Sequence, residues 1–154
     1  MEKTNVMRLL DVNSVPYTPH EYDSSIVNGE EVAKALKEDP ESVFKSLVCE
    51  NEKHMHFIFE VPVNAELNLK KAAKASGSKS IQMIKQKELL PLTGYVHGGC
   101  SPIGLKKPMP VYIEETAQLF DTITISAGKR GYQVELSPLD LASFTHGEFV
   151  SLID

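Results

Sequence analysis

The chain has 154 residues, of which 42% are hydrophobic and 24% are charged, and its net charge is −5. This composition is ordinary for a folded domain, so it excludes a mainly disordered chain, and the acidic balance argues against a general nucleic-acid coat protein. Two cysteines are too few for a secreted disulfide framework, and neither a signal peptide nor an apolar run of membrane-spanning length is evident. We therefore expect a single cytoplasmic domain over residues 1–154, without membrane association.

Charge is distributed unevenly along the chain. Residues 70–130 hold ten basic and four acidic side chains, a net charge of +6, so the remainder carries −11. Such segregation can create a phosphate-attracting face on an acidic protein. A solvated lysine surface explains the same pattern equally well.

The first half of the chain predicts a helix, an edge strand, a second helix and a hairpin of two strands. In chain order these elements cover residues 4–13, 17–22, 28–36, 43–50 and 54–61. Pro19 cannot donate to a sheet ladder, and Asn28 with Glu31 three residues later is typical of a helix cap. The polar residues 51–53 predict the hairpin turn.

The second half predicts short helices and strands around two glycine-rich loops. In chain order they are a helix, a strand, a helical turn, three strands and a helix, over residues 69–76, 80–84, 86–90, 111–114, 122–126, 132–136 and 137–144. Asn68 and Gly77 bracket the first of these helices, and Pro138 lies in the first turn of the last. Because no regular β-α-β alternation occurs, we expect an α+β fold with a mostly antiparallel sheet.

Lys45 is the first unusual residue. In the strand over residues 43–50, period-two alternation places it on the same face as Val43, Leu47 and Cys49. A lysine among apolar side chains either packs its stem at a rim or points into a pocket. In a pocket its ammonium group would be a strong local hydrogen-bond donor.

The segment 94–104 reads Gly-Tyr-Val-His-Gly-Gly-Cys-Ser-Pro-Ile-Gly. Its adjacent glycines, Gly98 and Gly99, let the backbone approach a ligand and can direct successive N–H groups at one oxygen. Such a nest suits a developing oxyanion or a phosphate, although a demanding loop without a ligand gives the same pattern. The segment matches neither a Walker phosphate loop nor the dinucleotide fingerprint.

Other chemical signals are weaker. A second glycine-bracketed segment, 126–131, carries a basic pair that either holds phosphates or forms a charged hairpin tip. Ser101 does not lie in a Gly-x-Ser-x-Gly elbow, and a Cys100 thiolate beside His97 is a minor alternative. His54 and His56 share a strand face without a third ligand at metal-site spacing, so no metal is expected.

Together these segments resemble the YbaK-type aminoacyl-tRNA deacylases, relatives of the editing domain of bacterial prolyl-tRNA synthetases. The resemblance rests on residues 43–48, 94–104, 106–107, 126–131 and 134–136, whose order and spacing extend it over nearly the whole chain. It implies an α+β fold in which short helices surround a mostly antiparallel, barrel-like mixed sheet. It also implies editing in trans of misacylated tRNA(Pro), above all Cys-tRNA(Pro).

The resemblance assigns roles to individual residues. Lys45, with the amides of Gly98 and Gly99, would orient the aminoacyl end and bind developing negative charge. The residues that would hold the substrate are Tyr22, Ser101, Pro102, Ser126 and Gln133, and those that would contact tRNA phosphates are Lys106, Lys107, Lys129 and Arg130. Gln133 stands where some cysteine-clearing members have an aspartate, so it offers a hydrogen bond to the substrate ammonium without a charge.

The implied reaction requires no protein nucleophile, metal or organic cofactor. The substrate thiol attacks its own ester carbonyl, expels tRNA and forms a cyclic thiolactone, which is carbon–oxygen lyase chemistry and leaves Cys100 a bystander. Two alternatives stay open: water-mediated hydrolysis of Ala-tRNA(Pro), and a non-catalytic module that binds tRNA or a synthetase. The expected partners are the acceptor end of aminoacyl-tRNA and prolyl-tRNA synthetase, and DNA is not expected.

Overall fold

The computed structural model describes all 154 residues. In chain order its elements are α1 (Asn5–Val12), β1 (Thr18–Glu21), α2 (Gly29–Ala35), η1 (Pro40–Ser42), β2 (Phe44–Asn51), β3 (His56–Pro62), α3 (Leu69–Ala75), β4 (Ile81–Met83), α4 (Gln86–Thr93), β5 (Val111–Glu114), η2 (Glu115–Leu119), β6 (Ile123–Ser126), β7 (Tyr132–Leu136), α5 (Pro138–Thr145) and β8 (Glu148–Val150). Each element expected from the sequence is present within a few residues. The 3-10 helices η1 and η2 and the strand β8 were not expected.

Side-chain caps fix where the helices begin. The Thr4 and Ser137 hydroxyls and the Asn28 and Asn68 amide oxygens accept backbone N–H groups from the first turns of α1, α5, α2 and α3. Each such cap stabilises a helix by about 1 kcal/mol, because it satisfies N–H groups that lack an intrahelical partner. Gly94, in the left-handed region at φ 81°, ends α4.

The strands form two sheets. The larger has the order β4-β2-β3-β5-β8, and the smaller has the order β1-β7-β6. The pairings of β2 with β3 and β4 are antiparallel, as is the whole smaller sheet, whereas β5 and β8 extend the larger sheet in parallel. A bridge between Val43 and Thr124 joins the two sheets, and neither sheet is closed. The α+β class is therefore confirmed, whereas the expected barrel-like closure is not.

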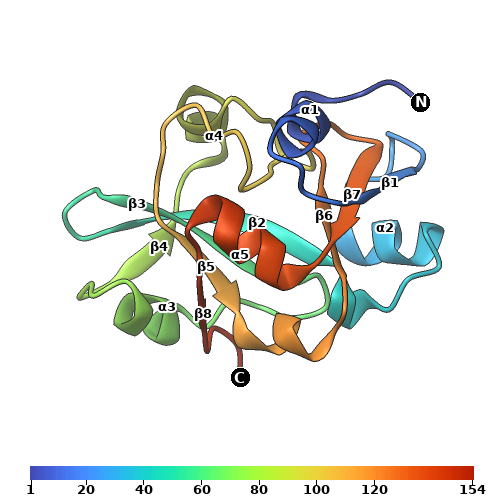
Figure 1. Ribbon diagram of the computed structural model, residues 1–154. Helices are drawn as coiled ribbons and strands as arrows, with labels where there is room; N and C mark the ends of the chain where they lie inside the picture. The colour runs from blue at the N-terminus through green and yellow to red at the C-terminus, as the bar shows by residue number, and fades with distance from the viewer.

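The main core lies between the two sheets. Ile58 of β3, Ile125 of β6 and Leu141 of α5 are among its fully buried members. The opposite face of the β2–β3 hairpin packs on α3 through Phe59 and Ala72. Figure 1 shows α5 across the strands of the larger sheet and α3 near β4. Because both faces of this hairpin are covered, residues of both parities along β3 are buried.

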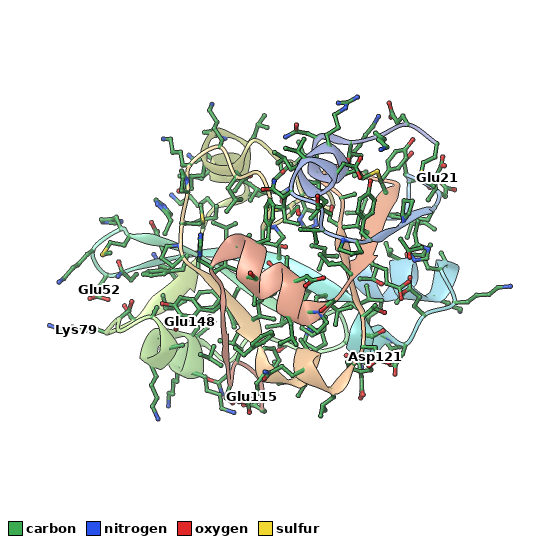
Figure 2. The ribbon with its side chains drawn as sticks, viewed as in Figure 1. Glu21, Glu52, Lys79, Glu115, Asp121 and Glu148 are labelled. Carbon is green, nitrogen blue, oxygen red and sulfur yellow. The ribbon has the colours of Figure 1, made fainter.

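Charged side chains lie mostly at the surface. In Figure 2 the labelled Glu52 and Lys79 reach outward near the β2–β3 turn, where the Lys79 N–H donates to the Glu52 carboxylate over 2.9 Å. Two glutamates, Glu60 and Glu114, are the exceptions, with 0% and 1% of their surfaces exposed. No helix combines the length and apolar character that crossing a membrane requires.

Candidate functional site

A cavity of about 480 Å³ lies along the free edge of β2. One edge of β2 pairs with β3 throughout, but β4 covers the other edge only from Cys49 to Asn51. The carbonyl of Val48 accepts the N–H of Ile84, and the four residues before it, 44–47, all line the cavity, as expected where a ligand approaches a strand from its unpaired edge. Other lining residues come from elsewhere along the chain and include Tyr22, Asn28, Leu89, Gly98, Cys100, Ser126 and Gln133. The volume falls within the ~300–1,000 Å³ of small-molecule sites.

Lys45 lies at the wall of this cavity. The sequence left open whether its side chain packs at a rim or faces a pocket, and the structure makes it a half-buried lining residue. Its ammonium group has no carboxylate within ion-pair distance and donates no hydrogen bond to the protein. An unpaired ammonium on a regular strand is positioned to bind an oxygen or phosphate of a ligand.

Ser46 follows Lys45 along the strand and also lines the cavity. It lies directly opposite Glu60 in the antiparallel register, and its hydroxyl donates to Glu60 Oε1 over 2.9 Å. The other oxygen, Oε2, is buried without a hydrogen-bond partner. Burial raises the pKa of Glu60 to about 8, although the Ser46 hydrogen bond acts in the opposite direction.

Glu60 was not among the functional residues expected from the sequence. The signal was present, since one acidic residue interrupts the apolar run Phe57–Val61 and glutamate is almost never fully buried without a partner. What the sequence lacked was the pairing of Ser46 with Glu60, which depends on the hairpin register. That pairing places a titratable group directly behind the cavity wall.

The glycine-rich segment 94–104 contributes to the cavity one of the two glycine residues whose amides were expected there. Gly98 lines the cavity at φ 85°, and a Cβ atom there would lie 2.8 Å from Val27 Cγ1. Gly99 is not a lining residue, and its N–H donates to the carbonyl of Val96 over 3.0 Å. A Cβ atom on Gly99 would lie 3.2 Å from the Arg130 nitrogen, so this glycine permits the close approach of the two glycine-rich loops. The amide that remains available to a ligand is therefore that of Gly98.

Ser101 and Pro102 support the loop from behind. Both are buried and neither lines the cavity, which differs from the substrate contacts expected of them. The Ser101 hydroxyl oxygen accepts the N–H of Ile103 over 3.3 Å, so it stabilises the turn of its own loop. This part of the sequence prediction assigned to the ligand two residues that the fold uses internally.

The smaller sheet supplies the facing wall. Ser126 and Gln133 lie opposite each other in the β6–β7 register, and both line the cavity with Tyr22. The Ser126 hydroxyl oxygen accepts the N–H of Gly128 over 3.1 Å. Gln133 is 6% exposed, and its Oε1 has no hydrogen-bond partner. An unpartnered amide oxygen is an acceptor for a donor on the ligand.

Cys100 also lines the cavity. Burial, with a smaller contribution from nearby Glu60, raises the pKa of its thiol to about 12. A thiol with this pKa holds its proton near neutral pH, whereas nucleophilic cysteines have lowered pKa values. The environment therefore argues against Cys100 as an attacking group.

The basic residues expected at phosphates lie outside the lining. Lys106 and Lys107 are exposed, and their N–H groups bond to carbonyls at the end of α4. Lys129 forms an ion pair with Glu2, whereas Arg130 donates to the carbonyl of His97, itself a lining residue, over 2.8 Å. Of the four, the structure attaches Arg130 most directly to the cavity.

Two groups of potential metal-ligand atoms were not found from the sequence. One consists of His20, Glu38 and Glu135, and the other of Glu50, His56 and Glu88. No third ligand for His56 was expected from the sequence, but folding brings it within reach of Glu50 and Glu88. In the first group His20 lies 2.8 Å from a Glu135 oxygen, an ion-pair geometry. Neither group includes a residue that lines the cavity.

Comparisons with known proteins identify similar chains. The family described as "Aminoacyl-tRNA editing domain" matches residues 23–144. The chain is 43% identical over 153 residues to "Putative Cys-tRNA(Pro)/Cys-tRNA(Cys) deacylase EbsC" of Enterococcus faecalis, covering 98% of this chain and 93% of EbsC. It is 27% identical over 125 residues to "Uncharacterized protein YwhH" of Bacillus subtilis, covering 81% and 79% of the two chains.

Solved structures show the same fold. The "Crystal structure of a putative trans-editing enzyme for prolyl tRNA synthetase" matches with a TM-score of 0.85 at 23% identity. The match covers 100% of this chain and 99% of that one.

Proposed function

Because the chain belongs to the aminoacyl-tRNA editing domain family, we propose that it deacylates misacylated tRNA(Pro), with Cys-tRNA(Pro) as its preferred substrate. EbsC, with 43% identity across nearly both chains, carries Cys-tRNA(Pro) and Cys-tRNA(Cys) in its name. The chain is an aminoacyl-tRNA editing enzyme, and the choice of cysteine and of tRNA(Pro) is the part we infer.

The observation that carries the proposal is the unpaired Lys45 ammonium at the wall of a cavity that Gly98 also lines. An ester carbonyl that accumulates negative charge during attack needs such preorganised donors, and one positioned donor is worth about a hundredfold in rate. Lys45 and Gly98 would bind the carbonyl oxygen or the ribose end, while the cavity holds the amino acid. Because Gly99 donates within its own loop, only one glycine amide has this role.

The attacking group comes from the substrate. The cysteine thiol that lines the cavity, that of Cys100, stays protonated near neutral pH, so we infer that the attacking thiol is the substrate's own. A cysteinyl ester brings its own thiol close to its carbonyl carbon, so the enzyme has only to position and stabilise. Attack forms a cyclic thiolactone and releases the tRNA 3′ end.

Gln133 bears on the choice of amino acid. Its buried Oε1 lacks a partner and can accept a hydrogen bond from the substrate ammonium. A neutral acceptor gives weaker charge pairing than an aspartate would, so this cavity selects by size and by attacking group more than by charge. Hydrolysis of Ala-tRNA(Pro) by a bound water is the second candidate, and Gln133 is the observation that favours it.

The tRNA partner would contact Arg130 first, because that residue is bonded to the cavity rim at His97. Lys106, Lys107 and Lys129 would extend the basic surface toward the acceptor stem. Prolyl-tRNA synthetase is the proposed protein partner, and the cytoplasm, where translation takes place, is the proposed location. We treat residues 1–154 as one editing domain, since Val6 and Leu10 of α1 belong to the main core.

A deacylation assay with Cys-, Ala- and Pro-tRNA(Pro) tests the proposal. We expect rapid release of cysteine, slower release of alanine, and no release of proline above the uncatalysed rate. Fast alanine release with slow cysteine release would support the hydrolase instead. Tight binding of tRNA without release of any amino acid would contradict the enzymatic function and support a binding module.

A further inference from the structure

Glu60 has no role in the function proposed above, yet its position is unusual. It lies on β3 and is fully buried. One of its carboxylate oxygens has no hydrogen-bond partner, and the other accepts a hydrogen bond from the hydroxyl of Ser46, a residue that lines the cavity. Burying a carboxyl group with an unsatisfied oxygen destabilises a fold. A site of this kind is expected where the group takes part in chemistry.

The Ser46 hydroxyl connects the buried Glu60 carboxyl group with the cavity. Its proton points to Glu60 Oε1, so its lone pairs are left to accept a hydrogen bond from the cavity side. Lys45, the proposed ligand of the ester, is the preceding residue on the same strand. Successive side chains of a strand alternate between its faces, but Lys45 and Ser46 both line this cavity, so a bound aminoacyl ester can contact both of them.

We propose that Ser46 and Glu60 form a proton relay that removes the proton from the group attacking the ester, which is the substrate thiol under the function proposed above. Ser46 touches the substrate, and Glu60 acts through Ser46. This inference rests on ester cleavage at the same site and adds the base that this reaction lacks.

Two proton transfers accompany the attack on the ester. The thiol S–H proton passes to Ser46 Oγ as the Ser46 proton passes to ionised Glu60. The sulfur electron pair forms the C–S bond, and the bond between the carbonyl carbon and the ribose oxygen breaks. The proton on Glu60 returns by the same route to the departing ribose oxygen. The products are the thiolactone and tRNA, and both protein residues regain their starting states.

The proton affinities of donor and acceptor are matched. Burial raises the pKa of Glu60 to about 8, close to the ~8.5 of a cysteine thiol, so transfer between them is nearly balanced in energy. The titratable group that faces Glu60 is the Cys100 thiol, from the loop that follows α4. Its strand neighbours, Ser46 on β2 and Ile113 on β5, do not titrate in this range.

Glu114 provides a matched control. It is a second buried glutamate of the same sheet, but its two oxygens accept the N–H groups of Leu152 and Thr116 over 2.8 Å and 2.9 Å. It does not line the cavity, so its substitution tests the effect of changing a buried glutamate without touching the relay.

The test compares Cys-tRNA(Pro) deacylation by the wild type, Glu60→Gln, Ser46→Ala, Ser46→Thr and Glu114→Gln. Glutamine keeps an oxygen that accepts from Ser46 but cannot take a proton. We expect Glu60→Gln and Ser46→Ala to lower kcat at least about tenfold, with KM changed less than about threefold. Ser46→Thr restores the hydroxyl and should restore kcat, and Glu114→Gln should keep it.

Proton movement separates the relay from a structural role. The wild-type kcat should rise with pH toward a plateau governed by Glu60, and it should fall in D₂O with a curved dependence on deuterium fraction, because two protons move together. Glu60→Gln should lose that curvature and follow the substrate thiol's own ionisation. Unchanged kcat and unchanged isotope dependence in folded Glu60→Gln would overturn the relay alone. An inactive wild type would instead overturn the proposed function.

Discussion

The larger sheet buries two glutamates, and they differ in what surrounds them. At the C-terminal side, each oxygen of Glu114 accepts a backbone N–H, and the residue ties β5 to the segment after β8 and to η2. At the cavity edge, Glu60 receives one hydroxyl from Ser46 and nothing on its second oxygen. Both side chains are almost completely buried, so burial alone does not distinguish them.

Glu114 and Glu60 differ in whether each of their carboxylate oxygens has a hydrogen-bond partner. Where the fold uses a buried polar residue for stability, its partners lie within the protein, and a missing partner is costly. Around the cavity several groups lack protein partners: the Lys45 ammonium, the Gln133 amide oxygen and one Glu60 oxygen. The Lys45 and Gln133 groups line the cavity and the Glu60 oxygen lies behind its wall, which favours this region as a site for a ligand and for chemistry.

The largest effect is expected from Lys45→Ala. Loss of the unpaired ammonium should lower kcat/KM for deacylation at least about a hundredfold, because a charge that stabilises the developing oxyanion is removed. The fold should persist, since this side chain makes no ion pair or hydrogen bond with the protein. Lys53→Ala, at an exposed hairpin position, is the control and should stay near wild type. Near-normal turnover by a folded Lys45→Ala protein would eliminate Lys45 as the central residue.

The dependence of stability on pH should reveal the buried carboxyl group of Glu60. The folded pKa of Glu60, about 8, exceeds its ordinary value of 4.5, so the folded state retains a proton that the unfolded state has lost. The free energy of unfolding should therefore fall as pH rises from about 4.5 to 8, by up to about 1.4 kcal/mol per pH unit, and then level off.

Chemical denaturation between pH 5 and 9 measures this slope. Glu60→Gln should flatten it, whereas Glu114→Gln should lower stability by roughly 1–3 kcal/mol because it weakens the hydrogen bonds from the Leu152 and Thr116 N–H groups. An unchanged slope in Glu60→Gln would show that Glu60 does not titrate in this window.

Gly98→Ala should impair the site through its backbone. The residue has φ 85°, and a Cβ atom would lie 2.8 Å from Val27 Cγ1, so the loop must move. We expect kcat/KM to fall about tenfold, the order of a partly displaced oxyanion donor. Gly77→Ala is matched in conformation at φ 66°, with open space around its Cβ and no place in the cavity. Equal losses in both variants would attribute the effect to backbone strain in general.

The smallest effect is expected at Cys100. Cys100→Ala should keep activity within about threefold, because the buried thiol is protonated and takes part in no step. Alanine is preferable to serine here, since it adds no second hydroxyl group to a cavity in which Ser46 is the proposed relay. Mass spectrometry of the wild type after rapid quenching should detect no acyl group on Cys100. An aminoacylated Cys100 together with an inactive variant would revive the thiol-enzyme interpretation.

Local sequence patterns predicted the helices and strands well, but they did not predict which residues lie opposite each other in neighbouring strands. Caps such as Asn28 and turn residues such as Asn51 act within a few residues, so they are legible in the sequence. The strand β8 was missed because its three residues become a strand only by pairing in parallel with β5. Glu60 was missed for the same reason, since its meaning comes from register with Ser46.

Some of the residues expected in the site line the cavity, and others do not. Lys45, Gly98, Ser126 and Gln133 were expected in the site and do line the cavity. Ser101 and Pro102 share a loop with Gly98, but sequence proximity did not reveal that their side chains turn into the core. Resemblance to a family points to a loop as a whole, whereas the backbone conformation decides which of its atoms reach a ligand.

The central claim is that this cavity cleaves an aminoacyl ester by using the substrate's own side chain. The most direct measurement compares Cys-, Ser- and Ala-tRNA(Pro) on one tRNA, so that phosphate contacts stay constant, and identifies the products. We predict fast release of cysteine as a thiolactone, much slower release of serine because its hydroxyl is a far weaker nucleophile, and slower release still of alanine. Alanine release as fast as cysteine release, with free cysteine and no thiolactone among the products, would contradict the claim.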